Sequence, residues 1–411
     1  MDETPPDRLA NRPSQVVIRL ARMLHASGMP AHELEERMEL TSRWLDTPAH
    51  FFSTPTSLFV SFERESPSTH LVRVTPPGVN LELSSQLHDL LGRIESEQLD
   101  ARAINRVLTA IDETPPEYSW PVKIVSYGVA SAAAAVFFGG QLPEVVAAGS
   151  IGLVACLLVW LTSIHARTRS LSDMTAALVA TLIAYAVAWA TGNLRTDITI
   201  LASLIVLIPG LGITVAVNEL ATQNLASGTA RLLGAITTFL TIAFGIVMGR
   251  SVAIHLFPIT PPAAGPPLEL GFLLLAMGFS ALAFTVLFQA RLTDAAWILL
   301  AVLIAFGGTR LGHWLFAPDA AAWTGAFLLG VASNLFGRYR DRPASVMLIP
   351  GMLILVPGSI GYFSLSAFMD HDVEHGIEAA FTMTIVAASI VTGLLMANVV
   401  VPATRPPKSQ P

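Results

Sequence analysis

Two kinds of hydrophobic spacing alternate along the first 120 residues. Residues 56–63 and 69–75 alternate apolar and polar positions, which predicts two strands. Apolar positions recur at helical spacing in four other segments, which are 14–29, 31–45, 81–96 and 100–111. The resulting order of helix, helix, strands, helix, helix predicts a small α+β soluble domain over residues 1–116.

Capping signals support these boundaries. Gly28 is suited to end the first helix, and Pro30 suits the first turn of the second. Asp100 is a typical N-cap for the helix that follows it. The segments 66–68 and 76–78 are rich in Ser, Pro and Gly, and they predict turns around the second strand.

Beyond residue 120 the polar periodicity gives way to long apolar runs that are sufficient to cross a bilayer. Ten such runs occur, at about 124–141, 145–164, 174–191, 198–217, 232–249, 270–290, 295–309, 320–336, 344–363 and 378–400. The seventh run is shorter than the rest. The pattern predicts an all-α polytopic membrane domain of ten helices.

A repeated tetrapeptide divides these runs into halves. Leu207–Gly210 lies in the fourth run and Leu348–Gly351 in the ninth, and both read Leu-Ile-Pro-Gly. A second Pro-Gly pair, Pro357-Gly358, follows the latter. Five helices per half would make the halves enter the membrane from opposite sides. We therefore predict two inverted five-helix repeats, at 117–265 and 266–401, followed by a disordered tail at 402–411.

Paired Pro-Gly interruptions have a physical meaning in a membrane. Proline removes a backbone donor and frees a carbonyl, in a medium without water to satisfy it. Such a break persists where it lines a cavity or is buried in protein, and its freed groups and half-helix ends suit a zwitterion or an ion. A simple proline kink, which membrane helices tolerate, is the alternative interpretation.

Polar residues follow both interruptions. Glu219 and Arg231 are candidate contacts for the charged groups of an amino acid, and Asp370, His371 and Glu219 are candidate proton carriers. The alternative for each is a solvated charge at a helix end. Asn334 is interpreted as a polar side chain that holds helices together by hydrogen bonding. The candidate substrate-binding set comprises Pro209, Gly210, Asn218, Glu219, Ser227, Gly228, Arg231, Pro350, Gly351, Pro357, Gly358 and Ser359.

Composition agrees with this division. Apolar residues make up 53% of the chain and charged residues 13%, against about 25% charged in ordinary soluble domains. Residues 1–120 carry 11 Lys and Arg with 18 Asp and Glu, whereas 121–411 carry 13 with 12. The lack of a basic cluster argues against nucleic-acid binding. The single cysteine, Cys156, excludes a disulfide scaffold, and the first 30 residues lack the apolar stretch of a signal peptide.

Loop charge sets the expected orientation. If the first domain is cytoplasmic, ten Lys or Arg residues flank the cytoplasmic ends of the runs, and three (Arg195, Arg250 and Arg310) lie outside. We therefore expect a multi-pass protein of the inner membrane, with both termini cytoplasmic.

The first domain offers little chemistry of its own. His32 and Glu36 are four residues apart on a predicted helix, near His25, Glu33 and Glu35, but two ligands do not make a metal site. Nucleophile-elbow, zinc-protease and phosphate-loop motifs are missing from the sequence. We predict no cofactor, no metal and no enzymatic activity.

The chain resembles the threonine/serine exporter family over nearly its whole length. The resemblance is carried by Leu24–Gly28 through Glu35, by Pro209-Gly210 with Asn218-Glu219, Ser227-Gly228 and Arg231, and by Val356–Ser359 with Asp370 and Gly376. Glu219 departs from the aspartate of the family pattern, which keeps the charge but changes its reach. The resemblance implies a cytosolic domain joined to ten spans, and export of L-threonine and L-serine driven by the proton gradient.

The leading hypothesis is therefore a secondary exporter, a proton antiporter of small neutral hydroxylated amino acids that works by alternating access. A membrane-anchored hydrolase-like enzyme and a small-solute channel or sensor are the alternatives. The expected partners are the amino-acid substrate, protons and the lipid bilayer, with self-association also open.

Overall fold

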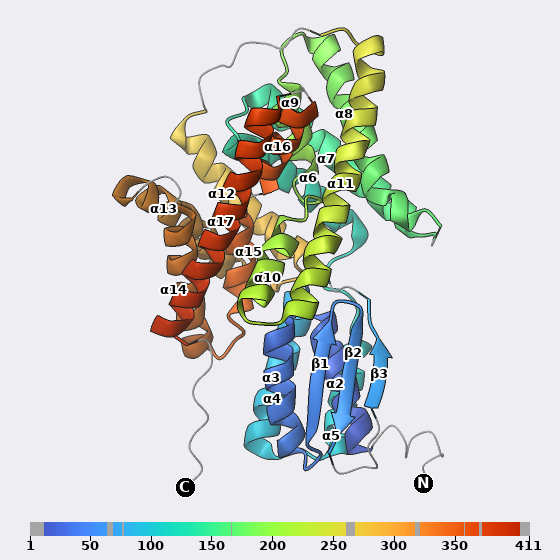
Figure 1. The fold of residues 1–411 in the computed structure, drawn as a ribbon, viewed down its shortest axis with the longest axis vertical. Coiled ribbons are helices and arrows are strands. Elements are labelled where there is room, and N and C mark those ends of the chain that lie inside the picture. The colour runs from blue at the N-terminus through green and yellow to red at the C-terminus, as the bar shows by residue number, and fades with distance from the viewer. Residues whose placement is uncertain are drawn as a thin grey trace.

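The N-terminal part of the protein is a compact α+β domain below a bundle of long helices (Figure 1). The computed structural model describes residues 12–63, 69–75, 78–165, 167–259, 268–316, 321–356, 358–369 and 372–402. The elements of the N-terminal domain are α2 (Pro13–Ala26), α3 (Ala31–Trp44), β1 (Ala49–Thr54), β2 (Ser57–Phe62), β3 (Thr69–Arg73), α4 (Leu81–Glu97) and α5 (Ala101–Asp112).

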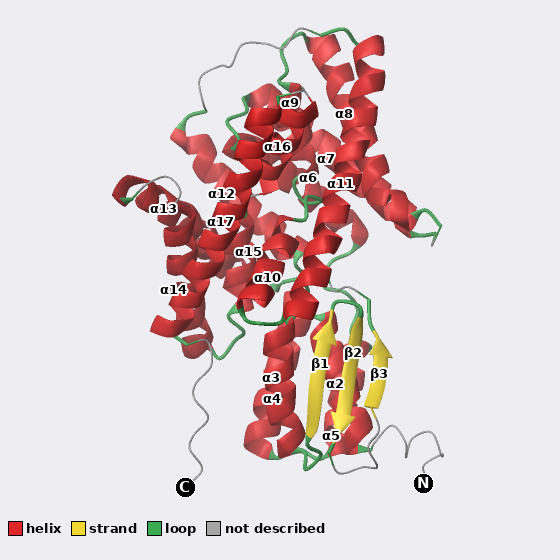
Figure 2. Cartoon of the chain, viewed as in Figure 1, coloured by secondary structure: helices red, strands yellow, loops and turns green. Residues whose placement is uncertain are grey.

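The three strands form one antiparallel sheet in the order β1-β2-β3 (Figure 2). Leu58, Val60 and Phe62 of β2 point into the core, which confirms the alternation predicted there. The same core takes the apolar faces of α2, α3, α4 and α5.

Strand β1 was not predicted from the sequence. Phe51 and Phe52 are adjacent, so the segment lacks clean apolar–polar alternation. In the structure Phe51 is buried, whereas Phe52 is exposed and packs against Phe59 across the strand pair. Cross-strand packing on the open face thus places an apolar residue where a polar one was expected.

Two of the predicted helix ends are confirmed, whereas Pro30, predicted in the first turn of the second helix, is the N-cap of α3. Gly28 has φ +94°, a conformation that favours glycine, and it follows the end of α2. Asp100 accepts a hydrogen bond of 2.8 Å from the backbone N–H of Ala103 and caps α5. Residues 66–68, 76 and 77, which were predicted to form turns, lie outside the described residues.

Helices make up all the described secondary structure after residue 119. These elements are α6 (Trp120–Phe137), α7 (Leu142–Ser163), η1 (Arg169–Leu171), α8 (Ser172–Thr191), α9 (Thr196–Leu204), α10 (Gly210–Ala221), α11 (Leu225–Leu256), α12 (Leu270–Leu287), η2 (Leu292–Asp294), α13 (Ala295–Leu315), α14 (Ala321–Arg340), α15 (Ser345–Leu355), α16 (Gly358–Met369) and α17 (Val373–Val400).

Eight segments in the described chain are long and apolar enough to cross a membrane, where the sequence predicted ten. The fourth predicted run is divided between α9 and α10, which are too short to count individually. The eighth predicted run corresponds to α14, which is not one of the eight membrane-crossing segments found in the structure. The protein is thus a helical multi-pass membrane protein, and the count of ten stays a prediction, as do the predicted domain boundaries.

The break in the ninth predicted run is displaced from the repeated tetrapeptide. Pro350 lies inside α15, which continues to Leu355, and α16 begins at Gly358. The segment is therefore interrupted at the second Pro-Gly pair and not at Pro350-Gly351, which corrects the alignment of the two tetrapeptides. A single proline bends a packed helix without ending it, because neighbouring helices hold both sides in place.

The helices that precede and follow the two breaks share a pattern of close packing. Gly245 of α11 lies against the backbone oxygen of Met174 at the start of α8. Gly393 of α17 lies against the backbone oxygen of Trp323 on α14, where an added Cβ would come within 2.6 Å. Gly245 and Gly393 are 148 residues apart, as are Gly210 and Gly358 at the starts of α10 and α16.

The N-terminal domain is anchored to the helical bundle through α4. The backbone N–H groups of Leu81 and Glu82 donate to the carbonyl oxygens of Phe288 and Gln289 at 2.9 and 3.0 Å. The Glu82 carboxylate also forms a two-point ion pair with Arg291. The positive N-terminus of α4 thus meets the end of α12 and places the domain at one end of the bundle (Figure 1).

The close packing at Gly245 gives a testable prediction. A Gly245→Leu side chain would collide with the α8 backbone, and such overpacking costs about 1–3 kcal/mol. We expect a lower apparent melting temperature of the detergent-purified protein and a lower yield of monodisperse material.

Gly234→Leu is the matched control on the same helix, because nothing lies within 4 Å of a Cβ at Gly234. Equal melting temperatures for the two variants would contradict the packing of α8 against α11.

Candidate functional site

The two helix breaks meet each other inside the bundle. A Cβ added at Gly210 would overlap the side chain of Val356 and would lie 3.5 Å from the Cα of Gly358. A Cβ added at Gly358 would lie 2.8 Å from Cγ2 of Ile208. Gly210 and Gly358 are both buried. The starts of α10 and α16 are therefore packed backbone to backbone, and only glycine fits at this crossing.

The chain is irregular just before the crossing. Residues 205–209 are not helical, and the N–H of Gly210 turns back to the carbonyl of Ile208 at 2.8 Å. No backbone N–H of the described chain donates to the carbonyl oxygen of Ile205 or of Val206. Free carbonyls inside a bundle are available acceptors for a cation or a ligand hydroxyl, because no water of the bilayer satisfies them.

The two short helices present the opposite polarity. Both α10 and α16 begin at the crossing, so their N-terminal N–H groups gather there. A helix N-terminus carries a partial positive charge and favours an anion. The crossing thus combines carbonyl acceptors with two helix N-termini, which together are complementary to the ammonium and carboxylate groups of an amino acid.

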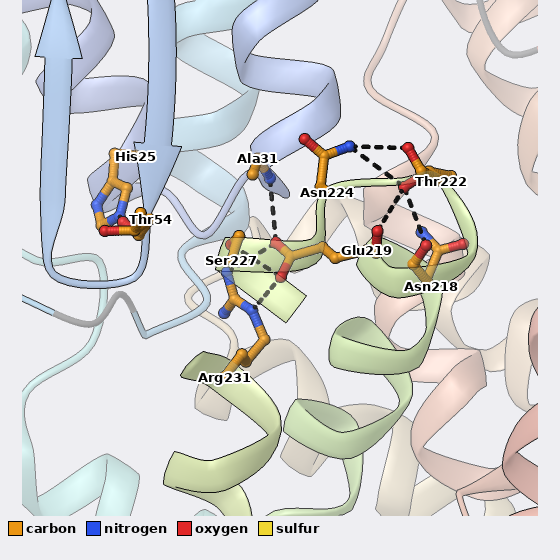
Figure 3. Close-up of polar contacts among 9 residues, drawn as sticks. All are labelled: His25, Ala31, Thr54, Asn218, Glu219, Thr222, Asn224, Ser227 and Arg231. Atoms are coloured by element: carbon orange, nitrogen blue, oxygen red, sulfur yellow. Dashed lines mark hydrogen bonds and ion pairs between the residues drawn. The ribbon is translucent and has the colours of Figure 1, made fainter. Parts of the chain in front are cut away.

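A second polar cluster lies at the opposite end of α10, where the N-terminal domain meets the bundle (Figure 3). Glu219 is 0% exposed, and its carboxylate forms a bidentate pair with Arg231 at 3.1 Å for both contacts. It also accepts from the Ser227 hydroxyl at 2.9 Å and from the backbone N–H of Ala31 at 3.1 Å. Ala31 is the first residue of α3, so this carboxylate joins the N-terminal domain to α10 and α11.

Gly228 makes the cluster possible. A Cβ there would come within 2.9 Å of the Leu220 backbone nitrogen and 3.0 Å of the Ala216 carbonyl. Glycine thus lets the start of α11 approach α10 closely enough for Ser227 and Arg231 to reach Glu219. Asn224, in the turn between these helices, donates to the carbonyl of Thr222 at 3.1 Å and holds the turn.

The predicted site residues therefore separate into two groups. Pro209, Gly210 and Gly358 belong to the crossing, with Ser359 in the first turn of α16. Glu219, Ser227, Gly228 and Arg231 form the interface cluster, and Asn218 is its half-buried neighbour. In the structure the carboxylate of Glu219 has four hydrogen bonds to protein groups, which leaves it engaged with the N-terminal domain instead of a ligand.

Other predicted residues lie elsewhere. Gly351 of α15 packs against Leu329 of α14, and Pro350 precedes it. Pro357, Asp370 and His371 lie outside the described residues. The turn between α16 and α17 is at the far end of the bundle from the N-terminal domain (Figure 1). Asp372 there caps α17 and pairs with His375 at 2.8 Å, so this region and Glu219 do not share one site.

Asn334 holds helices together, as interpreted from the sequence. Its amide donates to the Asn398 side chain at 2.8 Å and to the carbonyl of Val401 at 2.6 Å. These bonds join α14 to the end of α17 and satisfy a polar group in an apolar bundle.

The histidines and carboxylates of the N-terminal domain are used inside it. His25 is buried, with Nε2 3.1 Å from the carbonyl of Thr54, and desolvation lowers the pKa of this imidazole. Glu35 accepts from the Ser53 N–H at 2.6 Å, and its pKa is raised by desolvation. In the described part of the chain, no three such side chains gather as metal ligands.

Two interactions and one unpartnered buried hydroxyl were not predicted from the sequence. The backbone N–H of Ala31, the Glu82–Arg291 pair and the buried hydroxyl of Tyr127 all depend on segments far apart in the chain. A lone tyrosine in an apolar run was a detectable signal, since a buried hydroxyl requires a partner. The other two contacts have no local signature.

Comparison with known proteins finds two family models that match the chain. Residues 15–253 match a family model described as "Putative threonine/serine exporter", and residues 273–400 match one described as "Threonine/Serine exporter, ThrE". No solved structure matches the chain.

Fungal relatives match most of the length of the chain at about a quarter identity. "Pheromone-regulated membrane protein 10" of Eremothecium gossypii is 26% identical over 93% of this chain and 54% of its own length. The proteins of the same name from Candida albicans and Debaryomyces hansenii are 26% and 27% identical over 84% of this chain. The chain spans 32% and 35% of these two relatives, so all three are considerably longer than the matched region.

The interface cluster gives a second prediction. Glu219→Ala would leave the half-buried Arg231 and the first N–H of α3 without their acceptor, and leaving such groups unpaired costs about 1–3 kcal/mol. We expect faster hydrogen exchange in the first turn of α3 and at the start of α11, measured by mass spectrometry on the full-length protein.

Glu97→Ala is the control, because it removes an exposed pair with Arg93 on α4, and such pairs contribute about 0–1 kcal/mol. If α3 and α11 exchange as slowly in Glu219→Ala as in Glu97→Ala, the cluster does not hold the domain.

Proposed function

Because the chain belongs to the threonine/serine exporter family, we propose that it exports small neutral hydroxylated amino acids, serine and threonine, as a secondary transporter. The family is one of membrane exporters, and the eight apolar helices agree with a multi-pass membrane protein. The proposal adds the substrate, the proton coupling and the mechanism.

The observation that carries the proposal is the crossing of the two broken helices. Gly210 and Gly358 touch through their backbones, and the crossing offers free carbonyls on one side and helix N-termini on the other. An amino acid in its zwitterionic form satisfies both kinds of group at once. In a bilayer, unpaired backbone groups of this kind are costly, so a polar ligand is the natural occupant.

Alternating access requires two halves that move against each other, and the element order supports such halves. Each has three helices, then a broken helix, then a long helix, and matching glycines lie 148 residues apart. Helix α11 starts next to the N-terminal domain, whereas α17 starts at the opposite end of the bundle (Figure 1). We infer two inverted repeats that pivot at the glycine crossing.

The orientation follows from charge. Arg231 and Arg291 lie at the end of the bundle that carries the N-terminal domain, and positive residues mark the cytoplasmic side. We therefore propose an inner-membrane protein whose N-terminal domain and C-terminus are cytoplasmic, with export driven by inward proton flow.

The direct test is transport by the purified protein in proteoliposomes. Vesicles loaded with radiolabelled L-serine should lose it faster when a proton gradient is imposed, and should move it against its own gradient. Downhill flux alone would favour a channel, and no flux of serine or threonine under either condition would overturn the proposal.

The crossing gives a third prediction. Gly210→Ala places a methyl group against Val356 and Gly358, so the halves cannot keep their contact, and we expect serine export to slow about tenfold. Gly212→Ala is the matched control two residues away, since its Cβ would meet only Ala235 at an ordinary 3.8 Å. Equal export rates in the two variants would rule out a pivot at Gly210.

Glu219 provides a fourth prediction. Glu219→Gln keeps the size of the side chain but removes the charge paired with Arg231, so we expect serine export to fall while membrane insertion is retained. Efflux is measured with and without the proton gradient, and insertion is measured by the amount of reconstituted protein. Full serine efflux from this variant would exclude a role for the Glu219 charge in transport.

A further inference from the structure

Tyr127 has a buried hydroxyl that the fold itself leaves unsatisfied. The residue lies on α6, is 4% exposed, and its hydroxyl has no hydrogen-bond partner of ordinary geometry in the described chain. An unpaired buried polar group costs about 1–3 kcal/mol. A phenylalanine at this position would avoid the free-energy cost of the unpaired hydroxyl. The tyrosine is therefore explained if a bound ligand supplies the missing hydrogen-bond partner.

The hydroxyl lies at the helix break. The backbone N–H of Leu207, three residues before Gly210, lies next to the hydroxyl oxygen, but this N–H already donates to the carbonyl of Leu204 at 2.9 Å. Tyr127 also belongs to the same apolar cluster as Ile208, which touches Gly358, and as Tyr362 of α16. The tyrosine thus lies on α6 beside the first helix break, in an apolar cluster that also includes a residue of α16.

The free carbonyls lie on the same segment. Ile205 and Val206 have unpaired carbonyl oxygens and immediately precede Leu207. A ligand hydroxyl can accept from the Tyr127 O–H and donate to a carbonyl, which satisfies both orphan groups together. An ammonium group can donate to a carbonyl but cannot accept from the Tyr127 O–H, and a carboxylate can accept from that O–H but cannot donate to a carbonyl. Among the groups of an amino acid, a side-chain hydroxyl does both.

We propose that Tyr127 binds the side-chain hydroxyl of the transported amino acid and so selects serine and threonine over alanine and valine. This inference rests on the proposed function and deepens it. The half-helix ends would hold the groups common to all amino acids, and Tyr127 with the 205–206 carbonyls would contact the one group that differs. A buried hydrogen-bonding site rejects a ligand that lacks the matching hydroxyl, because its own groups are then left unpaired.

The test compares substrates in proteoliposomes. In the wild type we expect L-serine to be exported with a lower KM than L-alanine. In Tyr127→Phe we expect the serine preference, measured as the ratio of kcat/KM values, to fall about tenfold or more, mainly through a higher KM for serine. Alanine export should be retained or improved, because the orphan hydroxyl is gone.

Tyr185→Phe is the matched control. Tyr185 lies on α8 in the same apolar cluster and is 8% exposed, but its hydroxyl is not among the unpartnered buried atoms. We expect this variant to keep the wild-type serine preference. A loss of preference in both variants would indicate a general packing effect and would overturn the assignment to Tyr127.

The remaining outcomes separate the two proposals. If the wild type exports neither serine nor threonine, the proposed function fails. If the wild type prefers serine and Tyr127→Phe keeps that preference, only the role of Tyr127 fails, and the hydroxyl is satisfied by a structural water. If Tyr127→Phe cannot be reconstituted, competition on the wild type decides, since equal inhibition of serine export by alanine and by threonine overturns selection of the hydroxyl.

Discussion

The membrane part of this protein is organised around one constraint, which is that backbone groups in a bilayer must be paired within the protein. The helices are interrupted at residues 205–209 and again between α15 and α16, and no described backbone N–H donates to the carbonyls of Ile205 and Val206 in the first interruption. The bundle tolerates these interruptions because they are packed against each other. Glycine at both positions is a steric requirement, since any side chain there would separate the helices whose ends must meet.

The position of the N-terminal domain is set by its contacts with one end of the helical bundle. It is held to α10 and α11 through the buried Glu219 carboxylate, and to the turn after α12 through the α4 N-terminus and the Glu82–Arg291 pair. These contacts lie on helices from before and after residue 265. A domain anchored to both groups of helices is linked to any movement between them, so its contacts contribute to the energetics of the bundle.

The local sequence was sufficient to predict much of this architecture. Helical and alternating spacing predicted four of the N-terminal helices and two of its three strands, and apolar run length marked the membrane segments. Glycine and proline marked the interruptions, because their effect on the backbone is local. Strand β1 was missed, since the exposed Phe52 is stabilised by Phe59 on a neighbouring strand. The Leu-Ile-Pro-Gly repeat misplaced the second break, since Pro350 is accommodated within α15.

The sequence by itself determined which segments are apolar, where the backbone is weakened and which family the chain resembles, because these properties depend on residues close together in the chain. Only the tertiary structure decided that Glu219 pairs with Ala31 across 188 positions, that Gly210 faces Gly358, and that Tyr127 ends beside Leu207 without a partner. Those contacts result from how helices pack in three dimensions. Packing depends on the shapes of many distant side chains at once, and no local pattern records it.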